Sequence, residues 1–250
     1  MNYNPFSLEG KTVLVTGASS GIGRGVAINC SRMGATIIVA GRNEKRLGET
    51  LSLMEEGEHA KMVCDLTITD DIVQAVQALP KLDGVVHCAG IGQRIPAKLL
   101  QEENIDRVVS ANFKAPVLLQ AELLRQKKVN KAASIVFIAS IASWSPSLGN
   151  SIYSASKGAI ISYANCLSLE LAPRQIRVNC ISPAMVWTDL ILADGTDAEQ
   201  LKEDEKAYPL KRYGTPEDIA NLAIYMLSDA SAWMTGSNVN ITGGGHFIVR

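Results

Sequence analysis

The sequence predicts an α/β fold in which a doubly wound parallel sheet of about seven strands carries helices on both faces, in three αβα layers. Short runs of β-branched and apolar residues alternate with helix-length segments along the whole chain. This is the pattern of parallel strands joined by crossover helices. No linker, internal repeat or low-complexity stretch interrupts the alternation. We therefore expect residues 1–250 to form a single domain.

Composition and charge argue against several classes of protein. The chain is 47% hydrophobic and has a formal net charge of −1, which gives no electrostatic reason to expect binding to nucleic acid or an anionic membrane. Its five cysteines and three scattered histidines predict free thiols in a reducing compartment and no metal site. No apolar run approaches the roughly 18 residues that span a bilayer, and residues 1–11 do not resemble a secretion signal. We expect a cytoplasmic protein.

The first expected strand, Thr12–Val15, ends in the glycine-rich turn Thr16–Gly23, and a helix-like segment follows to about Met33. Strand, glycine turn and helix in this order form a cradle for a pyrophosphate, because a helix N-terminus presents unpaired N–H groups to an anion. The glycines allow a tight turn, close approach of the backbone to the pyrophosphate, and close helix–strand packing. The alternative is an ordinary glycine-rich turn. The residues assigned here to cofactor binding are Gly17, Ser19, Ser20, Gly21, Ile22 and Gly23.

The second expected strand, Thr36–Ala40, is followed by Gly41, Arg42 and Asn43. An acidic residue at this place binds the ribose 2′-OH of NAD, whereas an arginine binds the 2′-phosphate of NADP. Gly41 leaves the acidic position empty and Arg42 comes next. We therefore expect NADP(H) to be preferred over NAD(H), with Arg42 and Asn43 at the ribose. The alternative is that Arg42 begins a solvated helix.

The third and fourth expected strands are Met62–Cys64 and Asp83–His87. After the third, Asp65 either accepts a hydrogen bond from the adenine amino group or caps the following helix. Small residues after the fourth strand let the backbone pass close to a cofactor. The residues assigned to cofactor binding at these two strand ends are Asp65, Leu66, Ala89 and Gly90.

A polar residue, Asn112, interrupts the helical stretch expected from about Glu102 to Lys127. Pro116 in the same stretch predicts a kink or break, which leaves backbone groups near Asn112 free for water. Two later strands are expected at Arg177–Pro183 and near Asn238–Ile241.

Tyr153 and Lys157 open an apolar helix and lie one above the other on the same helical face, four residues apart. A fixed ammonium beside a phenol, whose unperturbed pKa is about 10, favours the phenolate. Ser140 ends the apolar run Ile135–Ala139, so its hydroxyl is expected at the carboxyl end of a strand, where open α/β sheets place their chemistry. The alternative is a half-buried aromatic residue beside a solvated charge.

Two further segments lead to predictions about subunit assembly and about a lid over the substrate. Ile152–Ala172 is apolar on more than one face, so we expect one face to cover the sheet and another to pack on a second subunit, giving a homo-oligomer, expected to be a tetramer. The charged helical stretch at about 187–214 follows a strand end, where a lid over a substrate belongs. The alternative is a surface helical hairpin without function.

Together these residues resemble the short-chain dehydrogenase/reductase family in its single-domain branch, which has a Rossmann-type fold. The likeness covers nearly the whole chain and rests on two signatures. The glycine signature lies at Thr16, Gly17, Gly21 and Gly23, and the active-site signature lies at Asn112, Ser140, Tyr153 and Lys157.

Two departures from the family pattern leave the proton-transfer groups untouched. His87-Cys88-Ala89-Gly90 stands where the family commonly has Asn-Asn-Ala-Gly, which is expected to weaken a backbone-stabilising contact. Pro183-Ala184 stands where Pro-Gly is usual.

The resemblance implies an oxidoreductase that reduces a carbonyl to an alcohol, or the reverse, by hydride transfer. By this likeness Ser140 hydrogen-bonds the carbonyl oxygen and Tyr153 donates the proton. Lys157 lowers the pKa of Tyr153 and holds the nicotinamide ribose, while Asn112 positions a water for proton resupply. The resemblance places the nicotinamide end against Pro183, Val186 and Thr188.

The substrate stays open at this stage. The resemblance favours a 3-oxoacyl-[acyl-carrier-protein] reductase. Five basic residues either bind the acidic carrier protein or are solvated helix ends, and these are Arg125, Lys127, Lys128, Lys131 and Arg174. One alternative is an NAD(H)-dependent dehydrogenase of a sugar, steroid or other secondary alcohol. A non-catalytic dinucleotide-binding regulator has no reason to keep all four active-site residues, and a nucleotide-sugar epimerase or dehydratase needs a larger C-terminal domain.

Overall fold

The computed structural model describes residues 3–192 and 197–245, and within them seven strands form one parallel sheet. The strand order is β3-β2-β1-β4-β5-β6-β7. The chain first builds outward from β1 to β3 and then returns to β4 on the other side of β1, which confirms the predicted doubly wound topology. The strands are β1 (Thr12–Thr16), β2 (Thr36–Gly41), β3 (Ala60–Val63), β4 (Leu82–His87), β5 (Val129–Ile138), β6 (Arg177–Pro183) and β7 (Asn238–Ile241).

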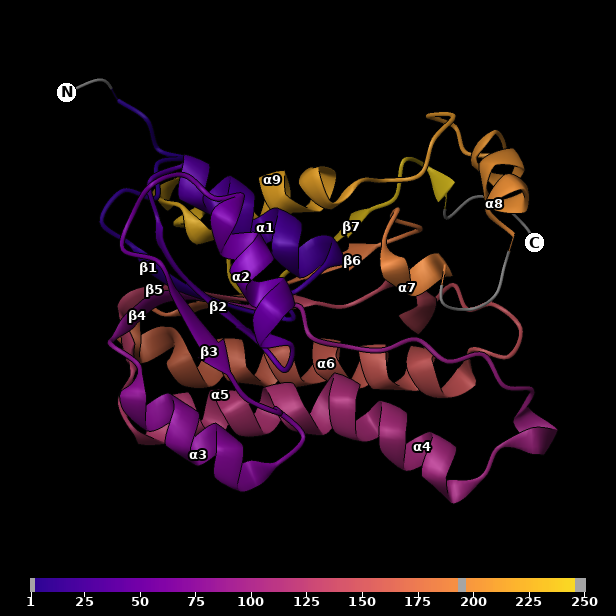
Figure 1. Cartoon of the computed structure of the whole chain (residues 1–250), viewed down its shortest axis with the longest axis horizontal. Helices are drawn as coiled ribbons and strands as arrows, with labels where there is room; N and C mark the ends of the chain where they lie inside the picture. The colour runs from indigo at the N-terminus through magenta and orange to yellow at the C-terminus, as the bar shows by residue number, and fades with distance from the viewer. Residues whose placement is uncertain (1–2, 193–196, 246–250) are drawn as a thin grey trace.

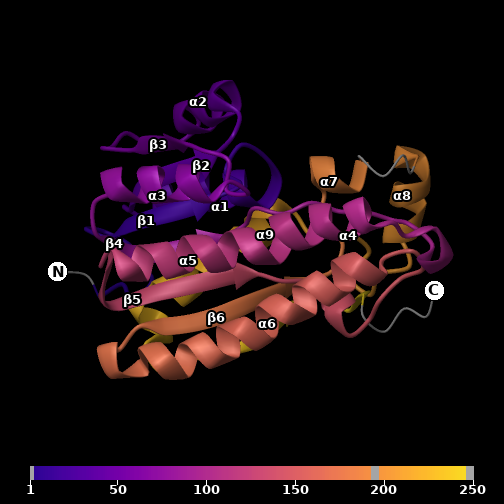
Figure 2. The same cartoon turned by 90° about the horizontal axis from the view of Figure 1, so that it is seen from below.

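Helices cover both faces of this sheet (Figure 1). α1, α2 and α9 lie over one face, and α3, α5 and α6 lie over the other. Figure 2 shows α5 and α6 side by side along the second face. The bounds are α1 (Gly21–Arg32), α2 (Glu44–Ser52), α3 (Thr69–Ala78), α4 (Glu102–Val109), α5 (Ala115–Arg125), α6 (Ser151–Leu171), α7 (Asp189–Leu192), α8 (Ala198–Glu205) and α9 (Pro216–Leu227).

Strand β1 shows why the sheet is buried on both faces. Val13 and Val15 pack with α1 and α9, whereas Leu14 packs in the opposite layer with α3 and α5. Successive side chains of a strand point to opposite faces. Continuous apolar runs therefore indicate strands covered on both sides, as parallel sheets require.

The predicted interruption near Pro116 takes the form of a π-helical turn, Ser110–Lys114, between α4 and α5. Pro116 lies in the first turn of α5, where proline fits because its missing N–H is not needed. The side chain of Asn112 is buried and hydrogen-bonds the backbone of Ile91. That backbone groups near Asn112 serve a water stays a prediction.

One apolar face of α6 is covered within one chain. Ile160, Ala164, Leu167 and Leu171 pack in the core against the sheet. Lys157 is buried on another side of the helix, whereas Leu169 is 77% exposed. That a further face of α6 packs on a second subunit, giving a homo-oligomer, stays a prediction.

The carboxyl ends of β1, β4, β5 and β6 meet at one edge of the sheet, where α7 and α8 also lie (Figure 2). Open α/β sheets bind ligands at this edge, near the point where the strand order reverses. No helix among the described residues is long and apolar enough to cross a membrane.

Candidate active site

The glycine turn after β1 has room only for glycine. Gly17 has a φ of +64°, and a Cβ there would lie 2.8 Å from the Cα of Ala89. A Cβ on Gly23 would lie 2.4 Å from the carbonyl oxygen of Gly17. Gly21 has a φ of +53°, a conformation that side chains rarely adopt. Backbone thus packs closely against backbone at these positions, which fits the tight turn that a pyrophosphate cradle at the start of α1 needs.

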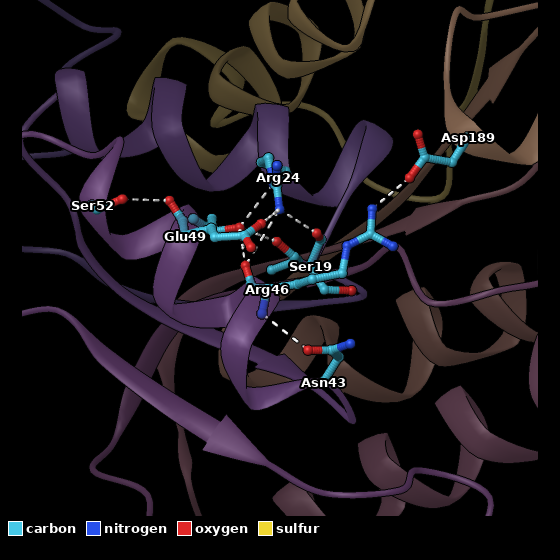
Figure 3. Close-up of polar contacts among 9 residues, drawn as sticks. Ser19, Arg24, Asn43, Arg46, Glu49, Ser52 and Asp189 are labelled. Atoms are coloured by element: carbon cyan, nitrogen blue, oxygen red, sulfur yellow. Dashed lines mark hydrogen bonds and ion pairs between the residues drawn. The ribbon is translucent and has the colours of Figure 1, made fainter.

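Ser19 and Ser20 are the residues of the turn that directly precede α1. Ser20 is the N-cap of α1, but its side chain makes no capping hydrogen bond among the described residues. The carbonyl of Ser19 accepts a 2.6 Å hydrogen bond from Nη2 of Arg24, one turn along the helix (Figure 3). The backbone of the glycine turn is therefore held in place by a side chain of α1.

At the end of β2, Asn43 is the N-cap of α2, and its side chain accepts a hydrogen bond from the N–H of Arg46 at 3.0 Å. Arg42 precedes this cap, so the alternative that Arg42 begins a helix is wrong. Its guanidinium lies 3.5 Å from a carboxylate oxygen of Asp65. Arg42 and Asp65 therefore lie together where an adenosine ribose is expected.

Asp65 does not cap the helix that follows it. Its carboxylate accepts hydrogen bonds from the N–H and the hydroxyl of Thr67, at 2.9 and 2.7 Å, and the N-cap of α3 is Ile68. Partial burial raises the pKa of Asp65, but the bonds from Thr67 and the charge of Arg42 outweigh it and leave that pKa below the ordinary value. The side chain of Leu66 is buried in the core.

The departure at His87 and Cys88 is accommodated by two contacts. Oγ1 of Thr16 accepts hydrogen bonds from the N–H groups of Cys88 and Ala89, at 3.1 and 3.2 Å, so a backbone-stabilising contact is present here. His87 is buried, stacks on Phe137 and lies 3.0 Å from Oε1 of Gln120. Burial lowers the pKa of His87 to about 4. The imidazole is therefore neutral near pH 7 and is part of the buried core.

A cavity of about 1230 Å³ lies at the carboxyl edge of the sheet. Ser140 enters it from the end of β5, where its Oγ accepts a 3.1 Å hydrogen bond from the N–H of Ala142. Tyr153 and Lys157 enter it from α6. The cavity brings together residues expected from five separate stretches of sequence. The predicted site residues among its lining are Ile22, Gly90, Ser140, Tyr153, Lys157, Pro183, Val186 and Thr188.

Lys157 is a buried cation at the centre of this site. Its Nζ donates a 2.8 Å hydrogen bond to the carbonyl of Ile138 and lies 5.8 Å from the centroid of the Tyr153 ring. Burial lowers the pKa of Lys157 to about 8, although nearby Cys88 and Cys180 act to raise it. A positive charge near the Tyr153 phenol favours the phenolate.

Asn112 fixes the loop that follows β4. Its side-chain oxygen accepts from the N–H of Ile91 at 2.8 Å, and its amide donates to the carbonyl of Ile91 at 2.9 Å. Its amide also lies 3.2 Å from Oγ of Ser156. A Cβ on Gly90 would lie 3.1 Å from the Asn112 oxygen and 3.5 Å from Nζ of Lys157. The loop backbone is therefore held tightly beside the buried ammonium.

Comparison with known proteins identifies the class. A family model described as enoyl-(acyl carrier protein) reductase matches residues 17–246. The chain belongs to the short-chain dehydrogenase/reductase family. The 3-oxoacyl-[acyl-carrier-protein] reductase FabG of Rickettsia felis is 33% identical over 95% of this chain and 97% of its own length. An L-xylulose reductase of Caenorhabditis elegans is 32% identical over 96% of this chain and 97% of its own length.

A solved structure gives the same result. A putative NAD(P) dependent gluconate 5-dehydrogenase from Beutenbergia cavernae matches with a TM-score of 0.86 and 31% identity, covering 96% of this chain and 98% of that one. As a short-chain dehydrogenase/reductase, the protein is an NAD(P)-dependent oxidoreductase that acts on CH–OH groups or the corresponding carbonyls.

After β6 the backbone turns at Pro183-Ala184 into a segment held by Gly214. The N–H of Trp187 donates to the carbonyl of Gly214, and the N–H of Gly214 donates to the carbonyl of Met185, both at 2.9 Å. Oγ1 of Thr188 lies 3.3 Å from the carbonyl of Val186. The alanine in place of the family's usual glycine thus does not prevent an ordered strand end.

Several lining residues were missed by the sequence interpretation. Gln93 and Arg94 follow β4 and line the cavity, and Oε1 of Gln93 is buried without a hydrogen-bond partner among the described residues. In the sequence, the only feature that points to Gln93 and Arg94 as site residues is that they are polar and follow an expected strand. From the charged stretch at 187–214, the residues that line the cavity are Thr188, Leu190, Ile191, Asp197, Gln200, Leu201, Asp204 and Tyr208. Asp194, Gly195, Thr196 and the tail after Gly245 lie outside the described residues.

Proposed function

We propose that this protein is an NADP(H)-dependent carbonyl reductase whose chemistry is carried by Ser140, Tyr153 and Lys157. The supporting observation is the buried ammonium of Lys157, 5.8 Å from the Tyr153 ring and in the same cavity as the Ser140 hydroxyl. Two hydroxyl donors and a cation in one cavity suit an oxygen atom that gains negative charge. A carbonyl oxygen undergoing reduction is such an atom.

In this proposal each residue has a separate task. When bound, the nicotinamide supplies the hydride that reduces the substrate carbon. Ser140 donates a hydrogen bond to the carbonyl oxygen, and Tyr153 transfers its phenolic proton to that oxygen as general acid. Lys157 stabilises the resulting phenolate and holds the nicotinamide ribose. Asn112 keeps the neighbouring loop in place and is proposed to position a water for proton resupply.

The remaining predicted residues are proposed to hold the cofactor. The glycine turn, with Gly17, Gly21 and Gly23, accepts the pyrophosphate because its shape excludes side chains. Thr188 and the Val186 backbone hold the nicotinamide carboxamide. The stretch at about 187–214 is proposed to act as a lid, because it contributes eight residues to the cavity wall.

Arg42 supports NADP(H) as the preferred cofactor. It follows Gly41 at the end of β2, and its side chain is largely exposed and lies 3.5 Å from the carboxylate of Asp65. A bound 2′-phosphate would offer Arg42 a stronger partner. We expect Arg42→Ala to weaken NADPH binding by about 1.5–3 kcal/mol in a fluorescence titration and to leave NADH binding nearly unchanged. Equal binding of NADPH and NADH by the wild type would contradict the proposed preference for NADP(H).

Two substrate classes compete, and polar side chains on a cavity wall that also carries many apolar ones support a polar substrate. The sequence relatives include 3-oxoacyl-[acyl-carrier-protein] reductases, and other relatives have names that specify xylulose and gluconate. Arg94, Asp197, Gln200 and Asp204 line the cavity and together offer a cation, carboxylates and an amide. These groups suit a hydroxylated or acidic small molecule better than a long acyl chain.

The basic residues give the carrier-protein alternative no support within one chain. Lys127, Lys131 and Arg174 line a separate hollow of about 850 Å³ beside the start of β5, whereas Ser140 follows the end of β5. Strand β5 has ten residues, so these basic residues lie about 30 Å from Ser140. Arg174 and Lys128 also donate to the carbonyls of Val129 and Leu79.

A substrate panel tests this choice. We expect NADPH oxidation with polar 2-keto and 3-keto compounds, including keto sugars and keto acids, to exceed that with 3-oxoacyl thioesters in kcat/KM. Arg94→Gln should lower kcat/KM for keto acids more than for neutral keto sugars. If a 3-oxoacyl thioester were the best substrate and Arg94→Gln had no effect, the polar class would be wrong.

A further inference from the structure

An ion pair joins two helices that lie far apart in the sequence. The guanidinium of Arg46, on α2, lies 2.5 Å from the carboxylate of Asp189, the first residue of α7 (Figure 3). The two side chains are 42% and 65% exposed. The pair is therefore open to solvent and is not part of either hydrophobic core.

This pair lies between two segments that are expected to hold the cofactor. Asp189 follows Thr188, whose methyl carbon would lie 3.2 Å from a Cβ on Gly21, so Asp189 lies beside the glycine turn. Arg46 belongs to the helix whose N-cap, Asn43, follows the end of β2. One end of the bridge is thus next to the expected pyrophosphate and nicotinamide, and the other is next to the expected adenosine ribose.

The Arg46 end is firmly anchored. Its carbonyl accepts hydrogen bonds from Oγ1 of Thr50 at 3.1 Å and from Nη2 of Arg24 at 3.4 Å. Arg24 in turn binds the carbonyl of Ser19 in the glycine turn, and Oγ1 of Thr50 lies 2.8 Å from the carbonyl of Ala18. Helix α2 and the glycine turn therefore form one hydrogen-bonded unit.

The Asp189 end of the ion pair belongs to a much shorter helix. Helix α7 has four residues, and two of them, Leu190 and Ile191, line the cavity. A single turn of helix has few hydrogen bonds of its own to keep it in place. The side chain of its first residue, Asp189, is tied to α2 by the ion pair with Arg46.

We propose that Arg46 and Asp189 form a clasp that closes the cofactor cleft over the bound dinucleotide. The proposal rests on the dinucleotide binding proposed above. With the pair formed, α7 is tied to α2 across the rim, and Thr188 is kept against the glycine turn. The cofactor leaves only after the pair opens. Arg46 and Asp189 are positioning residues that slow release without touching the reacting atoms.

Stopped-flow measurement of NADPH release tests the clasp on the full-length protein. An exposed ion pair of this kind slows opening modestly, so Arg46→Gln and Asp189→Asn should each raise the release rate constant about two- to fivefold. The double variant should release no faster than either single variant, because the two substitutions remove the same contact. The charge-swapped variant R46D/D189R should recover part of the slow release, and KM for NADPH should rise in the singles while kcat does not fall.

Lys61→Gln is the matched control. Lys61 pairs with Glu44 on the same helix, α2, at 2.7 Å, and the two side chains are 43% and 64% exposed. This pair links α2 to β3 and lies away from α7, so its loss should leave NADPH release unchanged.

Three results would overturn the clasp. Slower release from Asp189→Asn would show that Asp189 competes with the cofactor phosphates for Arg46. Additive effects in the double variant would show that the two residues act separately. Tight wild-type binding with unchanged release in both single variants would overturn the clasp alone, whereas a wild type that binds neither NADPH nor NADH would overturn the proposed function as well.

Discussion

Tyr153 carries the proton transfer in the proposed reaction, and this assignment can be tested by removing one oxygen atom. Tyr153→Phe keeps the ring beside Lys157 and deletes the general acid. A general acid contributes roughly 10²–10⁴-fold to the rate, so kcat for the best keto substrate should fall at least a hundredfold. NADPH affinity, measured by fluorescence, should change little. Wild-type turnover in Tyr153→Phe would refute the assignment.

The charge of Lys157 gives cofactor binding a pH dependence. Burial lowers the pKa of Lys157 to about 8 from an ordinary value of 10.5, so Lys157 is an ammonium below pH 8 and loses its proton above it. The 2′-phosphate, with a second pKa of about 6, does not change charge in that range. The dissociation constant of NADPH should therefore rise as the pH increases from 7 to 9.5.

Lys157→Arg separates this effect from general alkaline loosening of the fold. Arginine stays charged throughout the range, so the rise in the dissociation constant above pH 8 should disappear in that variant. A wild-type constant that is flat between pH 7 and 9.5 would contradict the role given to Lys157.

At the scale of single residues, the sequence identified those with a fixed place in a pattern. Tyr153 and Lys157 were predicted to share a helical face, and both line the cavity. The Arg46–Asp189 pair left no such signal, because an ion pair between exposed side chains 143 positions apart follows no local periodicity. Gln93 was missed for a similar reason, since it lies in an irregular loop.

Helix α9 shows how a local sequence rule stabilises an element. Oγ1 of Thr215 accepts from the N–H of Asp218 at 3.3 Å, and the Asp218 carboxylate accepts from the N–H of Thr215 at 2.7 Å. This is a capping box, and Arg212 also binds the Asp218 carboxylate. Since α9 packs against α1, its start supports the layer behind the glycine turn.

Removing this cap should lower stability in a measurable way. Thr215→Ala is expected to cost about 1 kcal/mol, which corresponds to a fall in Tm of roughly 2–4 °C for a chain of this size. Thr215→Ser keeps the hydroxyl and should retain most of the wild-type Tm by calorimetry. Equal Tm values for the alanine variant and the wild type would show that the cap contributes nothing.

Strands and helices with a strong local sequence pattern were predicted well, whereas their exact ends and the neighbours that pack on them were not. Apolar runs located all seven strands of the sheet, although β5 begins at Val129, six residues before the predicted run. Pro116 correctly marked an interruption, but a π-helical turn has no sequence signature of its own. The apolar faces of α6 were recognised, but periodicity shows that a face is buried and does not show which neighbour covers it.

For the whole molecule, alternation of strands and helices was enough to predict the doubly wound topology, because right-handed crossovers leave few alternatives. The shape of the cavity was not predictable in the same way. It depends on how the loop after β4 and the segments around α7 and α8 pack at the sheet edge, and those segments have no repeating pattern. The substrate class therefore rests on the structure and the comparisons.

Assembly is the property of the whole molecule that a single substitution can test. Leu169, on α6, is 77% exposed, and a large apolar side chain so exposed is a candidate interface residue. We expect the wild type to have four times the 26.8 kDa mass of one chain by light scattering. Leu169→Glu would place a charge in an apolar interface and should reduce that mass. Leu53→Glu, at a side chain 56% exposed after α2, is the control and should not. A wild type of 26.8 kDa would refute the tetramer, and an unchanged mass in Leu169→Glu would refute an interface on α6 and direct attention to the exposed Trp233.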